Sequence, residues 1–531
     1  MPRLSMKVPR WLVAGALLGV GACAPISPVA GDPAGGGAAT PEAERVIGFG
    51  LAMIQDRYLS PVAIGDVAVA GMGGLSKIDP ALSIERPTGQ RLFLRYQGEA
   101  LADYPAPADD DVAGWSAMIV RAEREASAVS PKLRAAGSEQ LYQAVFDAGL
   151  AKLDRFSRYA GAVAARRRRA ARDGFGGIGV HYDLHAGDVV LTEVAPDSPA
   201  SRARLRIGDH VSAIDGTALA GLDSTSVADL FDGPVASSVA LTVRHPGNRQ
   251  AAQINLDRIL VVPRSVTMTM ADGIATIGIS SFRRNTAETV AKDLVKAEAI
   301  PGFRGVILDL RGTPGGLLDE GIAVAGLFID HGRIGLTRGR NPSSVQLYDA
   351  TPGAPGRTVP LVVLVDGRSA SAAEIVAAAL QDSGRAVLVG TNTYGKGTVQ
   401  AVIRMPNGGE MTLSWARFYA PSGYALHGLG VLPTVCTADP NTTPATALAT
   451  IGDGHSPVRG TIAAWRATTI EETALRARLR TVCPAGRHPD APRDRAVARD
   501  LLNNPGLYQQ ALDLTAPAVA AATTAMAVHQ P

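Results

Sequence analysis

The sequence predicts a multidomain α/β protein. With 531 residues the chain is too long for one hydrophobic core, so three or four domains are expected. Its second half alternates short apolar strands with helical segments, the pattern of helices packed on a parallel sheet. Helical apolar spacing marks the N-terminal region and the tail. The composition, 46% hydrophobic and 19% charged, is that of a folded rather than a disordered chain.

The N-terminus is predicted to be a targeting segment. A basic stretch precedes the apolar residues 11–20, which are too few to span a bilayer. They lead into Val-Gly-Ala-Cys, ending at Cys23, which resembles a bacterial lipobox. That resemblance implies a signal peptide at 1–22, a lipid on Cys23 and a tether at 23–40, and so a membrane-anchored lipoprotein of the periplasm or cell envelope. An ordinary signal peptide with a coincidental cysteine is the alternative.

Residues 41–172 are predicted to be mostly helical, beginning with a helix at 42–58. The basic run Arg166–Arg169 in this region is interpreted as a solvated helix face near a domain boundary. The whole chain has a net charge of +3, from 52 basic and 49 acidic residues. That balance gives no reason to propose a nucleic acid partner.

Residues 173–258 change character and show short β-like runs at 188–194 and 239–243 between turn signals. Residues 259–435 then alternate between the two kinds of element. The expected strands are 274–279, 305–310, 361–365 and 386–389, and the expected helices are 286–299, 318–327 and 372–380.

The tail, residues 436–531, holds two expected helices at 461–480 and 493–512 and an Ala/Thr-rich end that is expected to be poorly ordered. Besides the lipobox cysteine the chain has two others, Cys436 and Cys483. In an oxidising compartment they are expected to form a disulfide that ties the tail to the core. Two free buried thiols are the alternative.

Three segments carry the candidate chemistry, and the first is Leu308–Leu318. A buried strand ends there, and a glycine-rich turn opens a helix. Glycines let the backbone turn sharply and direct N–H groups outward. Such groups at a helix start suit an anion, which in acyl transfer is the tetrahedral oxyanion.

The second segment, Val365–Glu374, again leads from a buried strand through small residues into a helix. Ser371 at this junction can expose its hydroxyl beside unpaired backbone donors. The alternative is structural, because Ser371 with Glu374 also fits a capping box.

The third segment is Thr393–Gln400, in which Lys396 stands between two glycines after an apolar strand. A lysine acts as a base only when it is deprotonated, which requires burial or another perturbation that lowers its pKa. A solvent-exposed lysine in a turn is the alternative.

The sequence gives less support to two other kinds of site, a nucleotide-binding P-loop and a Ser-His-Asp triad. Gly390–Lys396 matches most of a P-loop, but Gly397 stands where the Mg²⁺-binding Ser or Thr belongs, and 399–405 is predicted to be a strand rather than a helix. A Ser-His-Asp triad has no support, because His331 and His427 lie in no recognisable motif.

In this order, the three segments resemble the C-terminal processing peptidase family (tail-specific proteases, serine peptidase family S41). Tyr394 replaces the usual Phe of the third motif, and Thr313 replaces the usual Asn of the first. Residues 416–423 and 428–433 are similar to further family segments, so the resemblance covers about 173–435. It implies a crotonase/Clp-like α/β core.

The family resemblance implies a role for each matching residue. Ser371 is the nucleophile, Lys396 the general base and Gln400 the residue that holds the lysine, with Ser369 a structural neighbour. The N–H of Ala372 then binds the oxyanion together with an N–H of Gly315 or Gly316. No metal or cofactor is implied.

Residues 173–258 resemble a PDZ domain. The segment Gly177-Ile178-Gly179-Val180 is similar to the loop whose N–H groups bind a peptide's C-terminal carboxylate. The apolar Ile178 and Val180 favour apolar terminal residues. A structural β-domain without a working pocket is the alternative.

Together these patterns predict a serine endopeptidase that cuts envelope proteins near free, apolar C-termini. Its other partner is the membrane, through the lipid anchor, while a homo-oligomer and an adaptor both stay open. The alternative is a non-catalytic PDZ scaffold lipoprotein, which the presence of Ser371, Lys396 and Gln400 disfavours.

Overall fold

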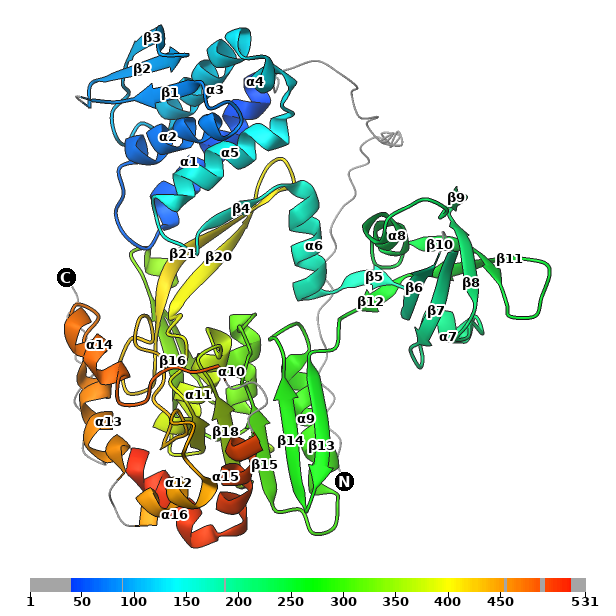
Figure 1. Cartoon of the computed structure of the whole chain (residues 1–531), viewed down its shortest axis with the longest axis vertical. Coiled ribbons are helices and arrows are strands. Elements are labelled where there is room, and N and C mark those ends of the chain that lie inside the picture. Colours follow the sequence, from blue (N-terminus) through cyan, green and yellow to red (C-terminus); the bar gives the residue numbers. More distant parts are fainter. Residues whose placement is uncertain (1–39, 88, 186–187, 453–455, 488–491, 517–531) are drawn as a thin grey trace, which may run out of the picture.

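The computed structural model describes most of the chain between Thr40 and Ala516 (Figure 1). The residues outside the description are 1–39, 88, 186–187, 453–455, 488–491 and 517–531. The predicted signal peptide, Cys23 and the Ala/Thr-rich end therefore lie outside the described residues. Within the described part, no helix has the length and apolarity needed to cross a bilayer.

The N-terminal region contains a small antiparallel sheet as well as the predicted helices, so the expectation of a mostly helical region was incomplete. Leu92 and Leu94 on the middle strand are buried while Arg91 is exposed, which is the two-residue period of a half-buried strand. Gln97 and Gly98 both have positive φ and close a tight hairpin. The elements are α1 (Thr40–Arg57), α2 (Ile64–Gly73), η1 (Gly74–Lys77), β1 (Leu82–Glu85), β2 (Arg91–Tyr96), β3 (Glu99–Pro105), α3 (Val112–Val129), α4 (Pro131–Ala135), α5 (Ser138–Ala151), β4 (Arg158–Ala160) and α6 (Ala162–Asp173).

The next unit lies to one side of the molecule in Figure 1 and has a sheet of order β11-β10-β8-β7-β6, with β9 paired to β8. A separate antiparallel pair, β5 with β12, joins it to the rest of the chain. We call this pair the stalk. The elements are β5 (Phe175–Gly177), β6 (Val180–His185), β7 (Asp188–Val194), α7 (Pro199–Arg202), β8 (His210–Ile214), β9 (Thr217–Ala218), α8 (Ser224–Phe231), β10 (Ser238–Arg244), β11 (Ala252–Asp257) and β12 (Ile259–Val261).

The core is a six-stranded sheet of order β13-β14-β15-β18-β19-β22, parallel except for β13. Its strands are β13 (Val266–Ala271), β14 (Ile274–Ile279), β15 (Gly305–Asp309), β18 (Leu361–Val365), β19 (Val387–Gly390) and β22 (Val435–Cys436). The predicted strands and helices of this part are present, with ends that differ by one or two residues. The helices are α9 (Thr286–Glu298), α10 (Leu318–Gly326) and α11 (Ala372–Asp382).

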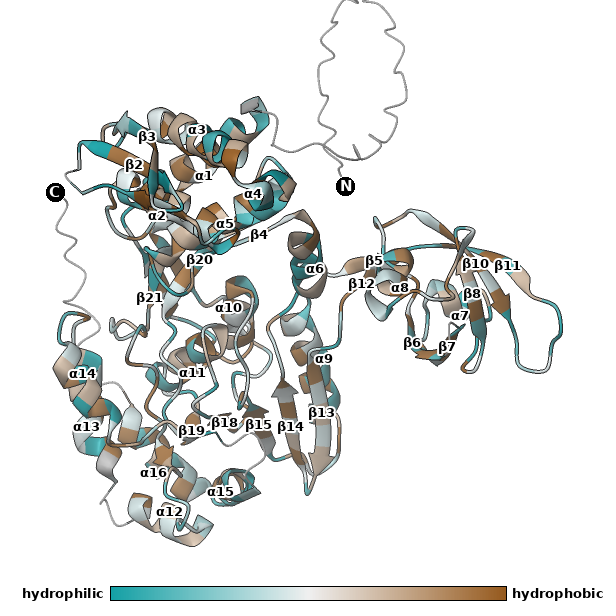
Figure 2. Cartoon of the chain, turned by 45° about the horizontal axis from the view of Figure 1, so that its top comes forward, coloured by the Kyte–Doolittle hydropathy of each residue, from teal (hydrophilic) through white to brown (hydrophobic). Residues whose placement is uncertain are grey.

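The C-terminal extension forms one layer of this core. Side chains that alternate along β18 separate into two clusters: Val363 packs with α9, α10 and α11, whereas Val362 and Leu364 pack with helices of the extension. Figure 2 shows the hydrophobic strands lying between the two helical layers. The extension therefore buries the second face of a sheet that would otherwise be exposed.

The two long helices predicted in the extension are each divided, which corrects that prediction. The segment 461–480 falls into α13 (Pro457–Ala467) and α14 (Thr473–Arg480), and 493–512 into α15 (Pro492–Asn503) and α16 (Pro505–Thr515). In the second case Asn504 caps the new helix through Leu507 N–H, and a proline follows it. The remaining helix is α12 (Pro444–Gly452). Cys436 and Cys483 form a disulfide.

A second sheet, of order β17-β16-β21-β20 with β4 paired to β21, links the core to the N-terminal region. Apolar residues of the β20–β21 hairpin, among them Met411 and Leu413, belong to the hydrophobic cluster of that region. The elements are β16 (Arg333–Arg338), η2 (Pro342–Ser344), β17 (Gln346–Asp349), β20 (Thr398–Arg404) and β21 (Glu410–Tyr419).

Candidate active site

Ser371 stands in a strained turn between β18 and α11. Its φ of 56° and ψ of −117° lie in a region that residues other than glycine rarely adopt. Such a conformation costs on the order of 1–3 kcal/mol and persists only where the surroundings fix it. The Ser371 N–H donates to Glu374 Oε2 at 2.9 Å, and the residue lines a cavity that Lys396 also lines.

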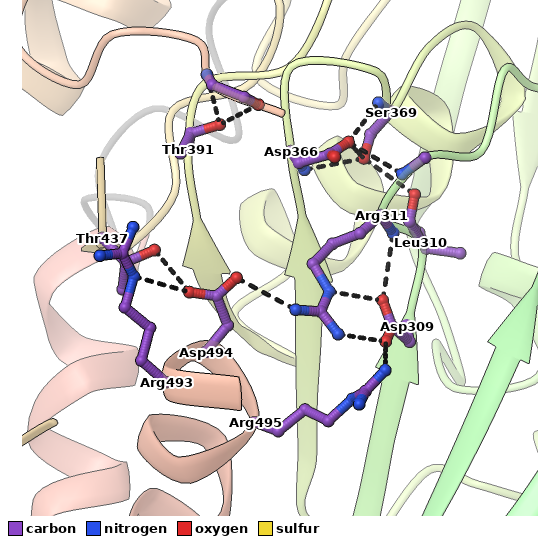
Figure 3. Close-up of polar contacts among 12 residues, drawn as sticks. Asp309, Leu310, Arg311, Asp366, Ser369, Thr391, Thr437, Arg493, Asp494 and Arg495 are labelled. Carbon is purple, nitrogen blue, oxygen red and sulfur yellow. Dashed lines mark hydrogen bonds and ion pairs between the residues drawn. The ribbon is translucent and has the colours of Figure 1, made fainter. Parts of the chain in front are cut away.

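Ser369, two residues earlier, has a different environment. It is fully buried, and its Oγ donates to the carbonyl of Leu310 at 2.8 Å, while its N–H donates to Asp366 Oδ1 at 3.0 Å (Figure 3). These bonds fasten the turn to the end of β15. Ser369 is therefore structural, and Ser371 is the serine that faces the cavity.

Lys396 lies across the cavity between two glycines that the fold requires. A Cβ at Gly397 would lie 2.1 Å from the backbone N of His427, and Gly395 has a φ of +89°. The Lys396 Nζ lies 5.3 Å from the ring centre of Phe156, a residue of the N-terminal region. Burial, and next the charge of Arg158, lower the pKa of Lys396, so the neutral form needed of a base becomes more accessible.

Glu374 joins the two segments. Its fully buried carboxylate accepts the N–H of Ser371, the N–H of Lys396 at 2.8 Å and that of Gly395 at 2.6 Å, together with the hydroxyl of Thr393. Burial raises the pKa of Glu374, and the four hydrogen bonds oppose that shift. One side chain thus fixes the backbone on both sides of the cavity. The sequence indicated Glu374 only as a capping residue.

The glycine-rich turn after β15 lies directly against Ser371. A Cβ on Gly315 would approach Ser371 Cβ to 2.7 Å, and one on Gly316 would lie 2.1 Å from the carbonyl O of Phe282. Ala370 N–H donates to the carbonyl of Thr313 at 3.0 Å, which holds the turn in place. In the described part of the chain, no acceptor takes the N–H of Gly316 or of Ala372. Both remain available to an oxyanion.

Gln400 lines the same cavity but is not bonded to Lys396. Its amide donates to Thr398 Oγ1 at 2.9 Å and to Ser414 Oγ at 3.2 Å. Among the described residues no hydrogen bond joins it to the lysine ammonium. The predicted holding role of Gln400 therefore stays a prediction.

The cavity has a volume of about 590 Å³. Its apolar lining consists largely of Phe282, Leu317, Leu318, Ile375 and Phe418. Charged and polar side chains line the cavity together with these apolar ones, and a cleft that combines both kinds of group is a candidate substrate site. The strand β20 follows Lys396 where a P-loop would open a helix, so the structure gives no support to nucleotide binding.

The C-terminal extension also braces the turns that carry Ser371 and Lys396, a feature that the sequence did not reveal. Arg480 donates to the carbonyl of Thr393 at 3.0 Å, and Gly367 N–H donates to Gly486 O at 2.6 Å. Below them, Arg311 pairs with Asp309 at 2.6 Å and with Asp494 of α15 at 3.2 Å (Figure 3). The side chains of Arg311 and Asp494 are 0% exposed, so this ion pair is fully desolvated.

The predicted carboxylate-binding loop lies at the start of β6, an edge strand that, among the described residues, pairs with β7 alone. Gly179 has a φ of +80°, and a Cβ there would lie 2.4 Å from Ser198 Cβ. The side chain of Ile178 is buried in the domain core at 2% exposure, and Val180 packs against it. Gly179 and Val180 are half-buried. The prediction that the Ile178 side chain favours apolar terminal residues is therefore not supported, because that side chain belongs to the domain core.

Comparisons with known proteins agree with these features. A family model described as Peptidase family S41 matches residues 273–437, and a PDZ domain model matches 176–256. The carboxy-terminal-processing protease of Bartonella bacilliformis is 33% identical over 306 residues, which cover 57% of this chain and 70% of that protein. The chloroplastic C-terminal processing peptidase of Tetradesmus obliquus is 32% identical over 301 residues, covering 53% of this chain and 64% of that protein.

A solved structure of a photosystem II D1 C-terminal processing protease aligns with 74% of this chain and 92% of that chain, at 25% identity and a TM-score of 0.38. The resemblance noted from the motifs is confirmed by the two family models and by the curated relatives. The chain therefore belongs to peptidase family S41, as a carboxy-terminal-processing serine protease.

Proposed function

We propose that the protein hydrolyses peptide bonds near the C-termini of envelope proteins, with Ser371 as nucleophile and Lys396 as general base. The observation that carries this proposal is the buried carboxylate of Glu374. It bonds to the backbone of both residues and so sets the strained serine and the partly buried lysine on one cavity. Positioned groups of this kind supply much of the rate in acyl transfer.

The proposed reaction has two halves. Neutral Lys396 takes the proton of the Ser371 hydroxyl as Oγ attacks the peptide carbonyl, and the N–H groups of Gly316 and Ala372 bind the resulting oxyanion. The C–N bond then breaks, and the leaving amine receives the proton from Lys396. Water, deprotonated by the same lysine, attacks the ester carbonyl. The C–O bond to Ser371 then breaks, and Ser371 Oγ takes the proton from Lys396. Gln400 would hold the lysine after a rotation of its side chain.

The PDZ domain, proposed to span 173–258, would capture the substrate tail. An extended peptide can pair with the free edge of β6, while the N–H groups of the Gly179 loop receive the terminal carboxylate. The peptidase core at 259–435 would then cut the chain further upstream. If amidation of the substrate C-terminus left cleavage unchanged, this part of the proposal would be wrong.

We also propose that the protein is an envelope lipoprotein anchored through Cys23. The disulfide between Cys436 and Cys483 supports an oxidising compartment. Incorporation of labelled fatty acid by the wild type but not by Cys23→Ala would agree with the anchor. Equal labelling of the two would contradict it.

The central test compares a soluble form (residues 24–531) with its Ser371→Ala and Lys396→Ala variants on an unfolded protein with an apolar C-terminus. Cleavage by the unmodified form alone is expected. Cleavage by both variants would place the reaction elsewhere. Tail binding without cleavage by any of the three would favour a non-catalytic scaffold.

A further inference from the structure

The rim of the active-site cavity carries more positive than negative charge. Its lining includes Arg158 of β4, Arg168 and Arg172 of α6, and Arg283, which follows β14. Within the described part of the chain, Glu410 is the one carboxylate that lines the same cavity. A cavity with this lining attracts anions.

Glu410 is already committed to neighbouring arginines. It is buried, at 3% exposure, and its Oε1 lies 3.4 Å from Arg172 Nη1 while its Oε2 lies 3.7 Å from Arg169 Nη1. Arg172 also pairs with Asp173 at 3.0 Å. These contacts account for Arg172 and Arg169 but leave the other cationic side chains of the cavity without a close counter-charge.

Arg158, Arg168 and Arg283 have no carboxylate within ion-pairing distance among the described residues; we call them the arginine rim. Partial withdrawal from water, and next the charge of Arg168, lower the pKa of Arg158, while Glu410 acts on it more weakly in the other direction. Both side chains line the same cavity. The fold fixes Arg158 through the pairing of β4 with β21, opposite Thr412.

The arginines of the basic run on α6 have different surroundings. Arg167 pairs with Asp229 of the PDZ domain, Arg169 with Glu410, and Arg168 lines the cavity. The interpretation of the whole run as a solvated helix face is therefore incomplete. Arg166 is exposed and lines no part of the cavity, so it serves as an internal control.

We propose that the arginine rim is a subsite for a substrate carboxylate beside the scissile bond. The carboxylate is either an Asp or Glu side chain or the terminal carboxylate of a tail that ends a few residues beyond the bond. Guanidinium groups bind carboxylates in a planar, two-pronged geometry that suits such a subsite. The inference rests on the proposed function, because it takes this cavity as the place of cleavage. It means that the N-terminal region contributes to substrate choice through Arg158 and Arg168.

The first arm of the test asks about side chains. Two peptides share one cleavage site and one long, free, apolar tail, and differ by Glu or Gln next to the scissile bond. The wild type is expected to cleave the Glu peptide with a kcat/KM about fivefold higher, and salt should reduce that ratio. The double variant Arg158→Gln/Arg168→Gln should bring the ratio near one, whereas Arg166→Gln should keep it.

The second arm asks about the terminus. A peptide whose C-terminus follows the scissile bond by about three residues, a length that an extended chain spans in about 10 Å, is offered free and amidated. Amidation also weakens binding to the PDZ domain, and this lowers kcat/KM for the amidated peptide by the same factor in every variant. The amide penalty is the ratio of kcat/KM for the free peptide to kcat/KM for the amidated one. If this ratio is smaller in the double variant than in the wild type, the terminal carboxylate is the ligand. If the ratio is unchanged but the preference for Glu is lost, the side-chain carboxylate is the ligand.

The outcomes separate this inference from the proposed function. If the double variant keeps both the Glu preference and the amide penalty of the wild type, the rim is not a subsite, although cleavage itself stands. If the wild type cleaves no peptide, the proposed function fails and the inference fails with it. Arg283→Gln provides an independent variant from another segment, and thermal unfolding of each variant checks that it is folded.

Discussion

The peptidase core and the PDZ domain are attached to the molecule in very different ways. The core is closed on its second face by the C-terminal extension and is braced by a desolvated ion pair, a disulfide and backbone hydrogen bonds. The PDZ domain is joined through the stalk, and one exposed ion pair, Arg167 with Asp229 at 3.2 Å, links it to α6. The peptidase core is thus held by many contacts, while the PDZ domain is joined to the rest of the chain through a narrow connection.

The largest effect is expected at Glu374, which holds both of the turns that line the cavity. Glu374→Ala removes the acceptor of four hydrogen bonds from a fully buried site. Activity should fall by about a thousandfold, because both catalytic segments lose their common support, and the free energy of unfolding by about 3 kcal/mol. Peptide kinetics and urea denaturation measure the two effects. A stable and fully active variant would show that Glu374 does not hold the segments of Ser371 and Lys396 in place.

The second effect concerns the ion pair beneath the site. Asp494→Ala leaves Arg311 buried with one carboxylate fewer, which should cost about 3 kcal/mol of unfolding free energy. Denaturation followed by tryptophan fluorescence gives the value. Asp513→Ala, on the exposed side of α16, is a control that should change little.

A third, smaller effect is expected in the pH dependence. In the proposed mechanism only neutral Lys396 can act as the base, so kcat/KM should rise with pH and level off below the ordinary lysine pKa of 10.5. Arg158→Gln removes the positive charge that, after burial, lowers the pKa of Lys396 most, so the pKa should rise and the curve should move to higher pH. Each unit of that displacement lowers the rate at neutral pH about tenfold. An unchanged midpoint would show that the charge of Arg158 does not act on the lysine.

The smallest effect is expected where the PDZ domain meets α6. Arg167→Ala removes an ion pair whose side chains are 52% and 54% exposed, so the free energy of unfolding should change by less than about 0.5 kcal/mol. A loss as large as that of Asp494→Ala would remove the contrast between the two attachments. Denaturation of the two variants side by side decides the matter.

The sequence predicted those features of the structure that depend on neighbouring residues alone. The turns that carry Ser371 and Lys396 are strand ends with glycines or small residues, and their form follows from neighbouring residues. Glu374 could not be assigned its second role, because that role depends on the packing of Gly395 and Lys396 against it. The same holds for Asp494, which meets Arg311 only after the extension packs on the sheet. The β1–β3 sheet was missed because its strands are short and stand among long helices.

The stalk has a further consequence for how such proteases diversify. Ile259 lies opposite Gly177, and Val261 opposite Phe175, so the chain enters and leaves the PDZ domain at adjoining points. A domain whose two ends adjoin can be replaced by another domain without moving the residues around Ser371. If the PDZ domain selects substrate tails as proposed, replacing this one segment would change the tail preference and leave the peptidase core as it is.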